Sequence, residues 1–507
     1  MKKTSSAVVP VIAVNRKADR PLHNQIYDAY RALIVNGNLR PGQQLPSTRA
    51  LTSELKVSRI PVLTAYAQLL AEGYCETRVG AGTFVSRSLP EQMLPTKGST
   101  GIRTTMRPGS RSIARRAQVL PRYQTQPGLR GLGPFCVGQP AYHHYPFNIW
   151  ANLVGRHCRN PRPGELHYGG PFGFEGLRDA ICNYLRTARS VRCAADQVLI
   201  VSGSQQALEI SARVLLDPGD WAWVEEPGYW LTRQVVTAAG GRLAPIPVDN
   251  EGLNVATGIK RCPKARAAYI TPSHQYPLGA TMSASRRFQL LEWADRAGSW
   301  IVEDDYDSEY RYGSMPIAAL QGIDRGARVI YTGTFSKTMF PALRLGYVVV
   351  PPDLVDRFAA VRNAMDLGPP YFLQAVLADF INEGHFARHI RRMRLLYNER
   401  RIALVDSLQK EFGTGHNVLG AEAGMHLVVT FPKGFRDVDV AERAAREKLW
   451  LVSLSSSYVG SRAVQGFILG FGGAPVAEIP RAVRQLKLLL MKAMVATATS
   501  RTQVWLT

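Results

Sequence analysis

The sequence predicts an α/β protein in which a small helical unit precedes a large domain, and three observations support this fold class. From about residue 133 onward, strand-like and helix-like patterns alternate, which is typical of a mostly parallel sheet with helices on both faces. Residues 20–87 show a separate pattern of short helices. Residues 88–132, between them, are basic and rich in Pro, Gly, Ser and Thr. A chain of 507 residues is also too long for a single hydrophobic core.

The charge balance of the chain is strongly basic, with 62 Lys and Arg against 39 Asp and Glu and a net charge of +23. Such an excess indicates a polyanionic partner, either a nucleic acid or an anionic membrane surface. The six cysteines include no C-x-x-C pair, which argues against a zinc site and against a disulfide framework. We therefore expect no metal site and a reducing compartment.

Residues 1–19 show only part of the pattern of a signal peptide. The apolar run Ala7–Val14 is short, contains Pro10 and is not followed by a small-residue cleavage site. No uninterrupted apolar stretch reaches the ~18 residues that cross a bilayer. We interpret residues 1–19 as an N-terminal extension and residues 496–507 as a C-terminal tail, and we expect a cytoplasmic protein with no membrane partner.

The N-terminal unit begins with a helix over residues 21–36, whose apolar face carries Leu22, Ile26, Tyr30 and Leu33. The pattern ends where Gly and Pro follow.

Two further short helices and a hairpin are expected in the same unit. Ser47 is a good N-cap for a helix that ends near Leu55, and Ser58 is a good N-cap for a second helix after a tight turn. Two short helices joined in this way form a helix-turn-helix. After Gly73, two strand-like runs flank the turn at residues 80–82, which predicts a β-hairpin, or wing.

Polar side chains on the outward face of this unit suit contacts with double-stranded DNA. Hydroxyls and helix-terminal N–H groups fit phosphate oxygens, and an arginine in the major groove can pair bidentately with guanine. The alternative is a solvated helix pair used only for contacts between copies of the chain. The predicted DNA-binding residues are Ser47, Thr48, Arg49, Arg59, Thr64, Tyr66 and Gly82.

Three motifs make this unit resemble the GntR-type winged helix. They are L-x-P-G-x-x-L-P-S-x-R, V-S-R-x-x-V and E-G-Y followed by G-x-G-T-F-V, all within residues 20–87. The resemblance implies that the helix over residues 58–70 docks in the major groove of an operator and that the wing enters the adjacent groove.

The stretch that follows reads as a linker. Between Arg87 and Arg130, nine basic residues stand against the single acid Glu91. A solvated, partly disordered tether over residues 88–132 is the favoured interpretation, because a structureless stretch of this length is rare inside a domain. An ordered loop layer over the larger domain is the alternative.

The large domain, residues 133–495, carries six strand-like runs and several helices. The apolar runs are at residues 198–203, 221–226, 265–271, 300–305, 328–333 and 345–350, with helices expected from Ser204, from about Tyr229 and over 284–297.

Lys337 lies in a loop just after the strand at residues 328–333. Open α/β sheets bind their ligands at the carboxyl ends of strands, so this lysine is a candidate for a ligand contact. A phosphate site is expected beside it. Ser204 and Gln205 open a helix whose free N–H groups suit a phosphate, and Thr334 and Arg344 can hold the same dianion.

Three further side chains suit a pyridine ring. Asp304 can keep a ring nitrogen protonated, Tyr306 can donate to a phenolate oxygen, and Tyr229 offers an aromatic face for stacking. Lys337 supplies an amine for a Schiff base. An aldehyde, a phosphate and a protonated pyridine together describe pyridoxal 5'-phosphate (PLP).

The motifs that carry these residues make the large domain resemble the fold-type I aminotransferases and, with the winged helix in front, the MocR-type regulators. They are YGGPFG (168–173), SGSQQAL (202–208), EEPGY (225–229), TPSHQYPLG (271–279), EDDYDSEYRY (303–312) and GTFSKTMFPALRLGY (333–347). The resemblance implies a PLP-dependent fold-type I domain with a small C-terminal subdomain and Lys337 as the cofactor lysine. It also implies a homodimer that exchanges its N-terminal domains head to tail, with Tyr168 reaching a phosphate across the dimer.

Two positions depart from the enzymes of that family. Tyr276 stands where they carry an asparagine that contacts the cofactor ring oxygen, and Ile468 stands where they place an arginine for the substrate carboxylate. Isoleucine cannot pair with a carboxylate. Either the effector is not an ordinary α-amino acid or it is held differently, and Arg233, Tyr276 and Arg462 are the candidate effector-binding residues.

Three functions are compatible with these features. The chain can be a transcriptional regulator that senses PLP, or an amine or amino acid that reacts with it. It can be an active aminotransferase that also binds DNA, or it can keep the fold without the cofactor. The intact cofactor residues argue against the third, while the winged helix, the linker and the basic charge favour the first. We expect catalysis to be vestigial.

Overall fold

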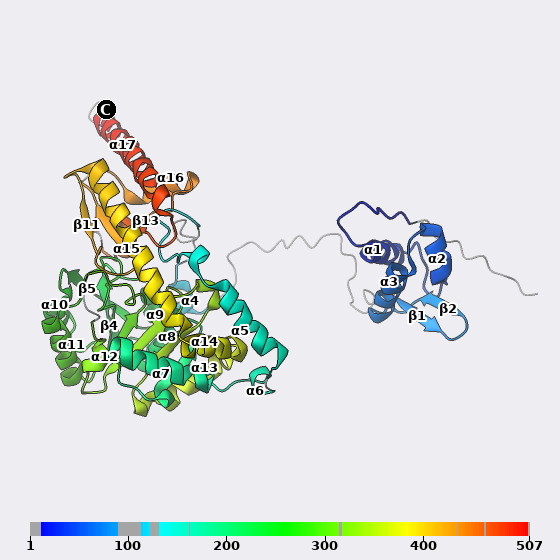
Figure 1. Cartoon of the computed structure of the whole chain (residues 1–507), viewed down its shortest axis with the longest axis horizontal. Coiled ribbons are helices and arrows are strands. Elements are labelled where there is room, and N and C mark those ends of the chain that lie inside the picture. The colour runs from blue at the N-terminus through cyan, green and yellow to red at the C-terminus, as the bar shows by residue number, and fades with distance from the viewer. Residues whose placement is uncertain are drawn as a thin grey trace, which may run out of the picture. The chain divides into compact units, whose positions relative to one another are not determined.

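In a computed structural model, the chain divides into two compact units, Met1–Arg111 and Ser112–Thr507 (Figure 1). The structure describes residues 12–89, 113–121, 131–161, 163–313, 317–432, 434–460 and 463–504. Each unit is described by itself below. Within the described ranges, none of the helices has the length and apolarity needed to cross a membrane.

The N-terminal unit is a three-helix bundle with a two-stranded wing, as predicted. Strands β1 and β2 pair antiparallel, from Cys75 opposite Val85 to Arg78 opposite Gly82. The elements are α1 (Leu22–Val35), α2 (Thr48–Leu55), α3 (Arg59–Ala71), β1 (Cys75–Arg78) and β2 (Gly82–Val85).

Local chemistry explains where these helices begin and end. The Ser47 hydroxyl accepts a hydrogen bond from the backbone N–H of Ala50 at 3.1 Å and caps α2, as expected. Lys56 adopts a left-handed conformation with φ of 52° and turns the chain toward α3. Ser58 occupies the N-cap of α3 but its side chain makes no capping hydrogen bond, so that part of the prediction is wrong.

The core of this unit is formed by one face of each helix. In α1 the fully buried side chains are Ile26, Tyr30 and Ile34, whereas Leu22 and Leu33 are only partly buried. The buried stripe is therefore turned slightly from the predicted face. Ile12, in the predicted N-terminal extension, also lies in this core.

The main sheet of the large unit has eight strands in the order β3-β10-β9-β8-β7-β4-β5-β6. Five neighbouring strands, β9, β8, β7, β4 and β5, run parallel, which confirms the predicted mostly parallel sheet. The strands are β3 (Val198–Val201), β4 (Trp221–Glu226), β5 (Arg242–Asp249), β6 (Gly252–Leu253), β7 (Ala267–Ile270), β8 (Trp300–Asp305), β9 (Val329–Thr334) and β10 (Gly346–Val349).

Strand β10 runs antiparallel to both β9 and β3, and β6 runs antiparallel to β5. Residues 335–345, which join β9 to β10, are fewer than the dozen or so residues that a parallel crossover needs. The chain therefore turns back on itself, and this turn carries Lys337 at the carboxyl end of β9.

Helices cover both faces of the main sheet (Figure 1). Alternate residues of β3 enter different cores: Leu199 and Val201 pack with α8, α9 and α13, whereas Val198 and Ile200 pack with α7, α14 and α15. The helices of the large unit, including those of its C-terminal part, are α4 (Arg115–Gln118), α5 (Phe147–Arg159), α6 (Pro163–Leu166), α7 (Glu175–Arg189), α8 (Ser204–Leu215), α9 (Trp230–Ala238), α10 (Val255–Arg261), α11 (Ala284–Ala297), α12 (Leu320–Ile323), α13 (Val355–Asp366), α14 (Tyr371–Asn382), α15 (His385–Phe412), α16 (Asp437–Arg446) and α17 (Ile479–Val504).

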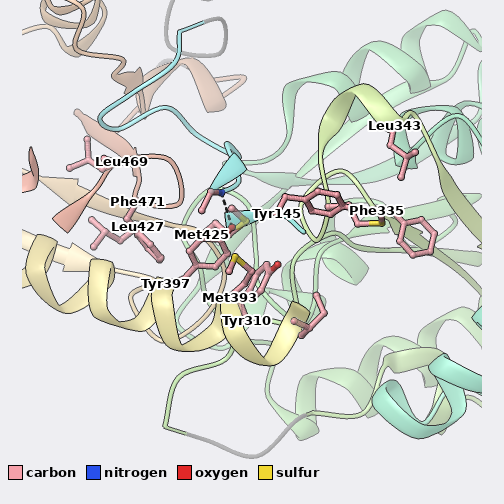
Figure 2. Close-up of a cluster of buried hydrophobic side chains, with 14 of the residues drawn as sticks. Tyr145, Tyr310, Phe335, Leu343, Met393, Tyr397, Met425, Leu427, Leu469 and Phe471 are labelled. Atoms are coloured by element: carbon pink, nitrogen blue, oxygen red, sulfur yellow. Dashed lines mark hydrogen bonds between the residues drawn. The ribbon is translucent and has the colours of Figure 1, made fainter. Parts of the chain in front are cut away.

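A second, antiparallel sheet forms the C-terminal part of the large unit. Its strands are β11 (Asn417–Leu419), β12 (His426–Thr430), β14 (Gly466–Gly470) and β13 (Val452–Ser453), in that spatial order. Leu427 and Leu469 point into a core that continues through Met393 and Tyr397 of α15 (Figure 2). It reaches Phe335, the first residue of the lysine loop, which is the turn 335–345 that carries Lys337. The small sheet and the lysine loop therefore share one hydrophobic core.

The predicted boundaries outside the domains are only partly within the described residues. Most of the predicted linker, residues 88–132, lies outside them, and Arg115–Gln118 within it forms the short helix α4. At the C-terminus, α17 continues to Val504, beyond residue 495 where the domain was expected to end.

Candidate functional site

A cavity of about 250 Å³ opens at the carboxyl ends of β8 and β9 and at the N-terminus of α8. This is the edge at which α/β sheets bind ligands. Eight of the predicted cofactor residues line it together: Ser204, Gln205, Tyr229, Asp304, Tyr306, Thr334, Lys337 and Arg344.

The amine of Lys337 projects into this cavity, where its Nζ donates a long hydrogen bond of 3.5 Å to the carbonyl of Gly138. Burial lowers the pKa of this amine, and the carboxyl groups of Asp307 and Asp304 oppose the shift only in part. A lowered pKa increases the fraction of neutral amine, which is the form that attacks a carbonyl group. The environment thus suits a Schiff-base lysine.

One end of the cavity is built to hold a phosphate. Gly203, with φ of 89°, leads into the first turn of α8, where Ser204 and Gln205 present free backbone N–H groups. Arg344 closes this end from the opposite side, and its guanidinium donates to the carbonyl of Ser202 at 2.6 Å. Thr334 adds a hydroxyl from the end of β9. N–H groups, a hydroxyl and a guanidinium together match a dianion.

At the opposite end, Asp304, the penultimate residue of β8, carries a buried carboxyl group. Its one hydrogen bond among the described residues comes from the hydroxyl of Thr332, at 3.2 Å. Burial raises the pKa of Asp304 to about 7. A protonated pyridine nitrogen placed against this carboxyl would supply the missing donor and stabilise its charged form. The residues present therefore fit PLP at both ends of the cavity.

The hydroxyl of Tyr306 belongs to a buried network that sequence reasoning missed. Nδ1 of His274 lies 3.1 Å from the Tyr306 hydroxyl and 3.0 Å from Oδ1 of Asp307. The other oxygen of Asp307 accepts from the backbone N–H of Met425 at 3.2 Å. With its proton on Nδ1, His274 donates to both neighbouring oxygens and leaves the hydrogen of Tyr306 free to point into the cavity. The only sequence signal was the presence of His274 and Asp307 in the quoted motifs.

His274, Asp307 and His426 also lie close enough together to hold a metal ion, since one ligand atom of each falls within 4.8 Å of the others. Nδ1 of His274 pairs with Asp307, and Nε2 of His426 hydrogen-bonds the carbonyl of Pro277 at 3.1 Å, whereas the buried Nε2 of His274 has no hydrogen-bond partner among the described residues. Burial and the nearby His274 lower the pKa of His426 to about 3, so its ring is neutral. We assign this cluster to positioning the hydroxyl of Tyr306, and the expected absence of a metal stays a prediction.

The predicted effector residues are placed differently from one another. Tyr276 lines the cavity, with its ring edge-on to Tyr229 at 5.6 Å. Arg233 does not line it; both of its terminal nitrogens donate to the carbonyls of Ser456 and Ser457, at 3.1 Å each. Arg462 lies outside the described residues. Arg233 is therefore a structural contact to the C-terminal part and not an effector ligand in this conformation.

Two other residues named from the sequence lie away from the cavity. Tyr168 is 81% exposed and is not among the residues lining the cavity of its own chain, so its predicted role across a dimer stays a prediction. Ile468 is fully buried in β14 and packs with Tyr276, Val428 and Val452.

On the N-terminal unit, the predicted DNA-binding arginines are solvent-accessible. Arg49 in α2 and Arg59 at the start of α3 are exposed, as are Ser47 and Thr64, while Thr48 is half-buried. Gly82 begins β2 of the wing with φ of 110°, a conformation that side chains disfavour.

Tyr66 corrects the prediction. It is 3% exposed, its hydroxyl donates to the carbonyl of Pro46 at 3.0 Å, and its ring packs edge-on against Tyr30 at 5.8 Å. Position 66 follows Val62 by four residues and precedes Leu69 by three, so it shares their inward face of α3. Tyr66 therefore packs in the core of the unit and is not exposed on its outward face.

Comparisons with known proteins agree with this architecture. Residues 22–85 match the family "Bacterial regulatory proteins, gntR family", and residues 134–466 match "Aminotransferase class I and II". The chain is 27% identical to the solved kynurenine aminotransferase of Pyrococcus horikoshii, with a TM-score of 0.69 over 75% of this chain and 97% of that one. Fold and site thus define a DNA-binding unit joined to a PLP-dependent aminotransferase-like domain.

Full-length relatives share both units. The chain is 40% identical to the probable rhizopine catabolism regulatory protein MocR of Rhizobium meliloti, over 94% of this chain and 95% of the relative. It is 30% identical to the HTH-type pyridoxine biosynthesis transcriptional regulator PdxR of Corynebacterium glutamicum, over 91% of this chain and 94% of that relative. The chain belongs to the MocR-type family of regulators, and it is a PLP-dependent, DNA-binding transcriptional regulator.

Proposed function

We propose that the aminotransferase-like domain is the sensor of this regulator, which responds to a small primary amine, an amino acid or PLP itself by changing how the winged helix binds its operator. The observation that carries the proposal is the complete cofactor cavity around Lys337 in the same chain as an exposed DNA-binding face. A ligand shifts such a system only if it binds the two conformations with different affinity.

Different side chains of the cavity would hold the phosphate, the ring and the aldehyde of the cofactor. When bound, PLP supplies an aldehyde that forms Schiff bases with amines. The N-terminus of α8, Thr334 and Arg344 would hold its phosphate, and Asp304 would hold the proton of the ring nitrogen. Tyr306 would donate to the ring oxygen. Lys337 would supply the amine that holds the aldehyde, and its lowered pKa would let the neutral amine accept a proton.

A set of contacts beside the cavity supports a route from the cofactor to the C-terminal part. The carboxylate of Glu226, at the end of β4, accepts hydrogen bonds from the backbone N–H groups of Val459 at 2.8 Å and Gly460 at 3.0 Å. Gly228 donates to Ser457 at 3.0 Å, and Arg233 reaches the same loop. This loop follows β13, so these bonds connect the cofactor-binding sheet with the small sheet. We propose that an amine in the cavity alters them.

We further propose that catalytic turnover is vestigial. Transamination needs the substrate carboxylate fixed so that the reacting bond is aligned, and a misplacement of about 1 Å can cost about 100-fold. Ile468 supplies no charge for that task. The alternative is an active aminotransferase that also binds DNA, which the fold of the solved aminotransferases keeps open. Multiple-turnover assays with amino donors and keto-acid acceptors decide between them, because turnover at or above ~1 s⁻¹ would be that of an ordinary enzyme.

The proposed assembly is a cytoplasmic homodimer formed through the large domains, with the N-terminal domains exchanged head to tail on a double-stranded operator. The exposure of Tyr168 outside its own cavity supports a role in the cavity of a partner. Mixing Tyr168→Phe with Lys337→Ala chains tests this directly. If Tyr168 acts across the dimer, each mixed dimer has one cavity with both changes and one cavity with neither. The unchanged cavity should then bind the cofactor with wild-type affinity, so half of the cavities in the mixed dimers recover full binding.

The central experiment measures operator binding by the full-length protein without cofactor, with PLP, and with PLP plus amines, while the absorbance of the cofactor is recorded. We expect the affinity for the operator to change together with the absorbance. An affinity that is identical in all three conditions would exclude the sensor function while leaving the DNA-binding unit intact.

A further inference from the structure

We infer that the amine recognised at this cavity carries no carboxylate group: the site takes a primary amine with an uncharged, apolar or aromatic body. This inference rests on the proposed amine sensing and names the chemical class of the effector. It follows from the face that the small sheet turns toward the cofactor residues, from the cations of the cavity and from its aromatic wall.

The small sheet has two different faces. On one face, Leu427 and Leu469 enter the main core. On the other, Val428 lies opposite Ile468, and Ile468 lies opposite Val452, in neighbouring strands. This second face belongs to the same strand side as His426, two residues before Val428, and His426 lines the cavity. Apart from His426, the part of this face next to the cavity is therefore apolar.

Tyr276 covers this apolar face and joins it to the cavity. Its ring packs with Val428, Val452, Leu454 and Ile468 in one buried cluster. A carboxylate brought to this face would lose its hydration without gaining a cation from the cluster, whose buried side chains offer one hydrogen-bond donor, the hydroxyl of Tyr276. An uncompensated ionised group in such surroundings is strongly disfavoured.

The cations of the cavity are committed elsewhere. Among the described residues that line it, Lys337 and Arg344 are the only lysine and arginine. Lys337 is needed for the Schiff base, and Arg344 lies at the phosphate end with a hydrogen bond to Ser202. Arg233 is held by two backbone carbonyls, and His426 stays neutral because its pKa is lowered to about 3. None of these groups is available for a second anion.

The wall of the cavity has the shape and polarity of a site for an uncharged body. The rings of Tyr229 and Tyr306 stand 5.6 Å and 6.4 Å from the ring of Tyr276, both in edge-on contacts. Trp230 and Leu231 complete the lining on the α9 side. Burying apolar groups against aromatic surfaces of this kind is favourable, whereas the two carboxyl groups in the lining, those of Asp304 and Asp307, offer no attraction to an anion.

Matched pairs of ligands that differ only in a carboxylate test the inference. The full-length, cofactor-loaded protein is titrated with isoamylamine against L-leucine, and with phenethylamine against L-phenylalanine. The readouts are the absorbance of the cofactor and the affinity for the operator. Each pair is compared at equal concentration of unprotonated amine, because the two members have different amine pKa values. We expect the carboxylate-free member to bind at least about tenfold more tightly, the lower range for leaving a buried polar group without a partner.

Equal or tighter binding of the amino acids would overturn this inference while amine sensing stands, and loss of that binding in Arg462→Met would identify the cation responsible. If no member of either pair changes the absorbance, amine sensing and this inference both fall. The two failures are therefore distinguishable.

A gain of function tests whether the face with Ile468 sets the preference. Ile468→Arg places a cation where the apolar cluster meets Tyr276, and we expect it to reduce or reverse the preference against carboxylates by about tenfold. Ile468→Leu is the matched control and keeps the original preference. A folded Ile468→Arg protein with unchanged preference would refute the assignment to this face. If circular dichroism shows that Ile468→Arg does not fold, the wild-type pairs decide alone.

Discussion

The two candidate sites of this protein are built in opposite ways. The candidate DNA contacts lie close together in the sequence, between Ser47 and Gly82, on short helices and a hairpin whose arginines are exposed to water. The cofactor cavity draws residues from Val137 to His426, at the ends of several strands and one helix, and all of them except Arg344 are buried or half-buried. The candidate DNA-binding site is therefore an exposed surface, whereas the cofactor site is an internal cavity.

This difference follows from what each site binds. A polyanion is met by arginines that remain charged in water and act over a Debye length of about 10 Å. A Schiff base needs a neutral amine and a dry site, so burial shifts the pKa values of the groups in the cavity. It lowers the pKa of Lys337, raises that of Asp304 to about 7 and lowers that of His426 to about 3. Exposed arginines therefore serve as fixed charges in one region, whereas a lysine in the cavity serves as the reactive group in the other.

The largest expected effect is at Lys337. Reduction of the cofactor-loaded protein with borohydride should fix the cofactor covalently to this residue, and Lys337→Ala should abolish the adduct completely. Lys260→Ala, at an exposed lysine of α10, is the matched control and should keep it. Mass spectrometry of the reduced proteins measures the result. An adduct that is still formed by Lys337→Ala would contradict the assignment of Lys337 as the Schiff-base lysine.

The second effect separates structural from binding residues in the N-terminal unit. Tyr66→Ala should lower the free energy of unfolding of this unit by about 3–5 kcal/mol, the range for truncating a buried aromatic side chain. Tyr66→Phe, which removes only the hydrogen bond to Pro46, should cost about 1 kcal/mol. Denaturant unfolding followed by circular dichroism measures both. The Tyr66→Phe protein should keep the sequence preference of the wild type for DNA. A changed preference would indicate that the Tyr66 hydroxyl contacts DNA.

The third effect tests burial in the cavity through pH. Because the pKa of Asp304 is raised above its unfolded value of 3.8, the folded cofactor-free protein binds a proton that the unfolded chain releases. This contribution to stability is fully present below about pH 4 and is lost as the pH rises toward about 7. Asp304→Asn removes the titration. The thermal midpoint of the cofactor-free wild type should therefore fall relative to that of Asp304→Asn between these pH values. A constant difference would show that this carboxyl is not buried as described.

The fourth effect concerns the exposed arginines. Arg59→Ala should weaken operator binding by about 1–3 kcal/mol and relax specificity at one base position. Arg87→Ala, at an exposed residue beyond the wing, should instead weaken binding uniformly across sequences and reduce the salt slope by about 1. Fluorescence anisotropy with the operator and with base-substituted duplexes measures both. Binding by Arg59→Ala that equals wild type at moderate salt would exclude docking through α3.

The smallest effect is on the orientation of Tyr306. Replacing His274 by Gln removes the group that directs the Tyr306 hydrogen into the cavity, so the pH at which the cofactor absorbance titrates should rise. Tyr306→Phe, which loses the donor itself, should raise it further, and the double variant should add little to Tyr306→Phe. Additive shifts in the double variant would mean that His274 acts independently of Tyr306.

Much of this protein was determined by its sequence alone. The sequence predicted six strands of the main sheet, the winged unit and the cofactor residues Ser204, Asp304, Thr334, Lys337 and Arg344, but it missed β5, β6 and the strands of the small sheet. Each strand is a short continuous apolar run, and the carboxyl ends of parallel strands meet at one edge whatever the loops between them do. Local signals were sufficient because these groups sit at element ends.

The tertiary structure decided the features that depend on which side of an element faces a neighbour. The inward orientation of Tyr66, the capture of Arg233 by the carbonyls of Ser456 and Ser457, and the network of His274, Asp307 and His426 are of this kind. They join residues that are far apart in the chain or lie on the ambiguous edge of a short helix. No local periodicity encodes such contacts, because they arise only when separately formed elements pack together and the burial of each side chain is settled by all of its neighbours at once.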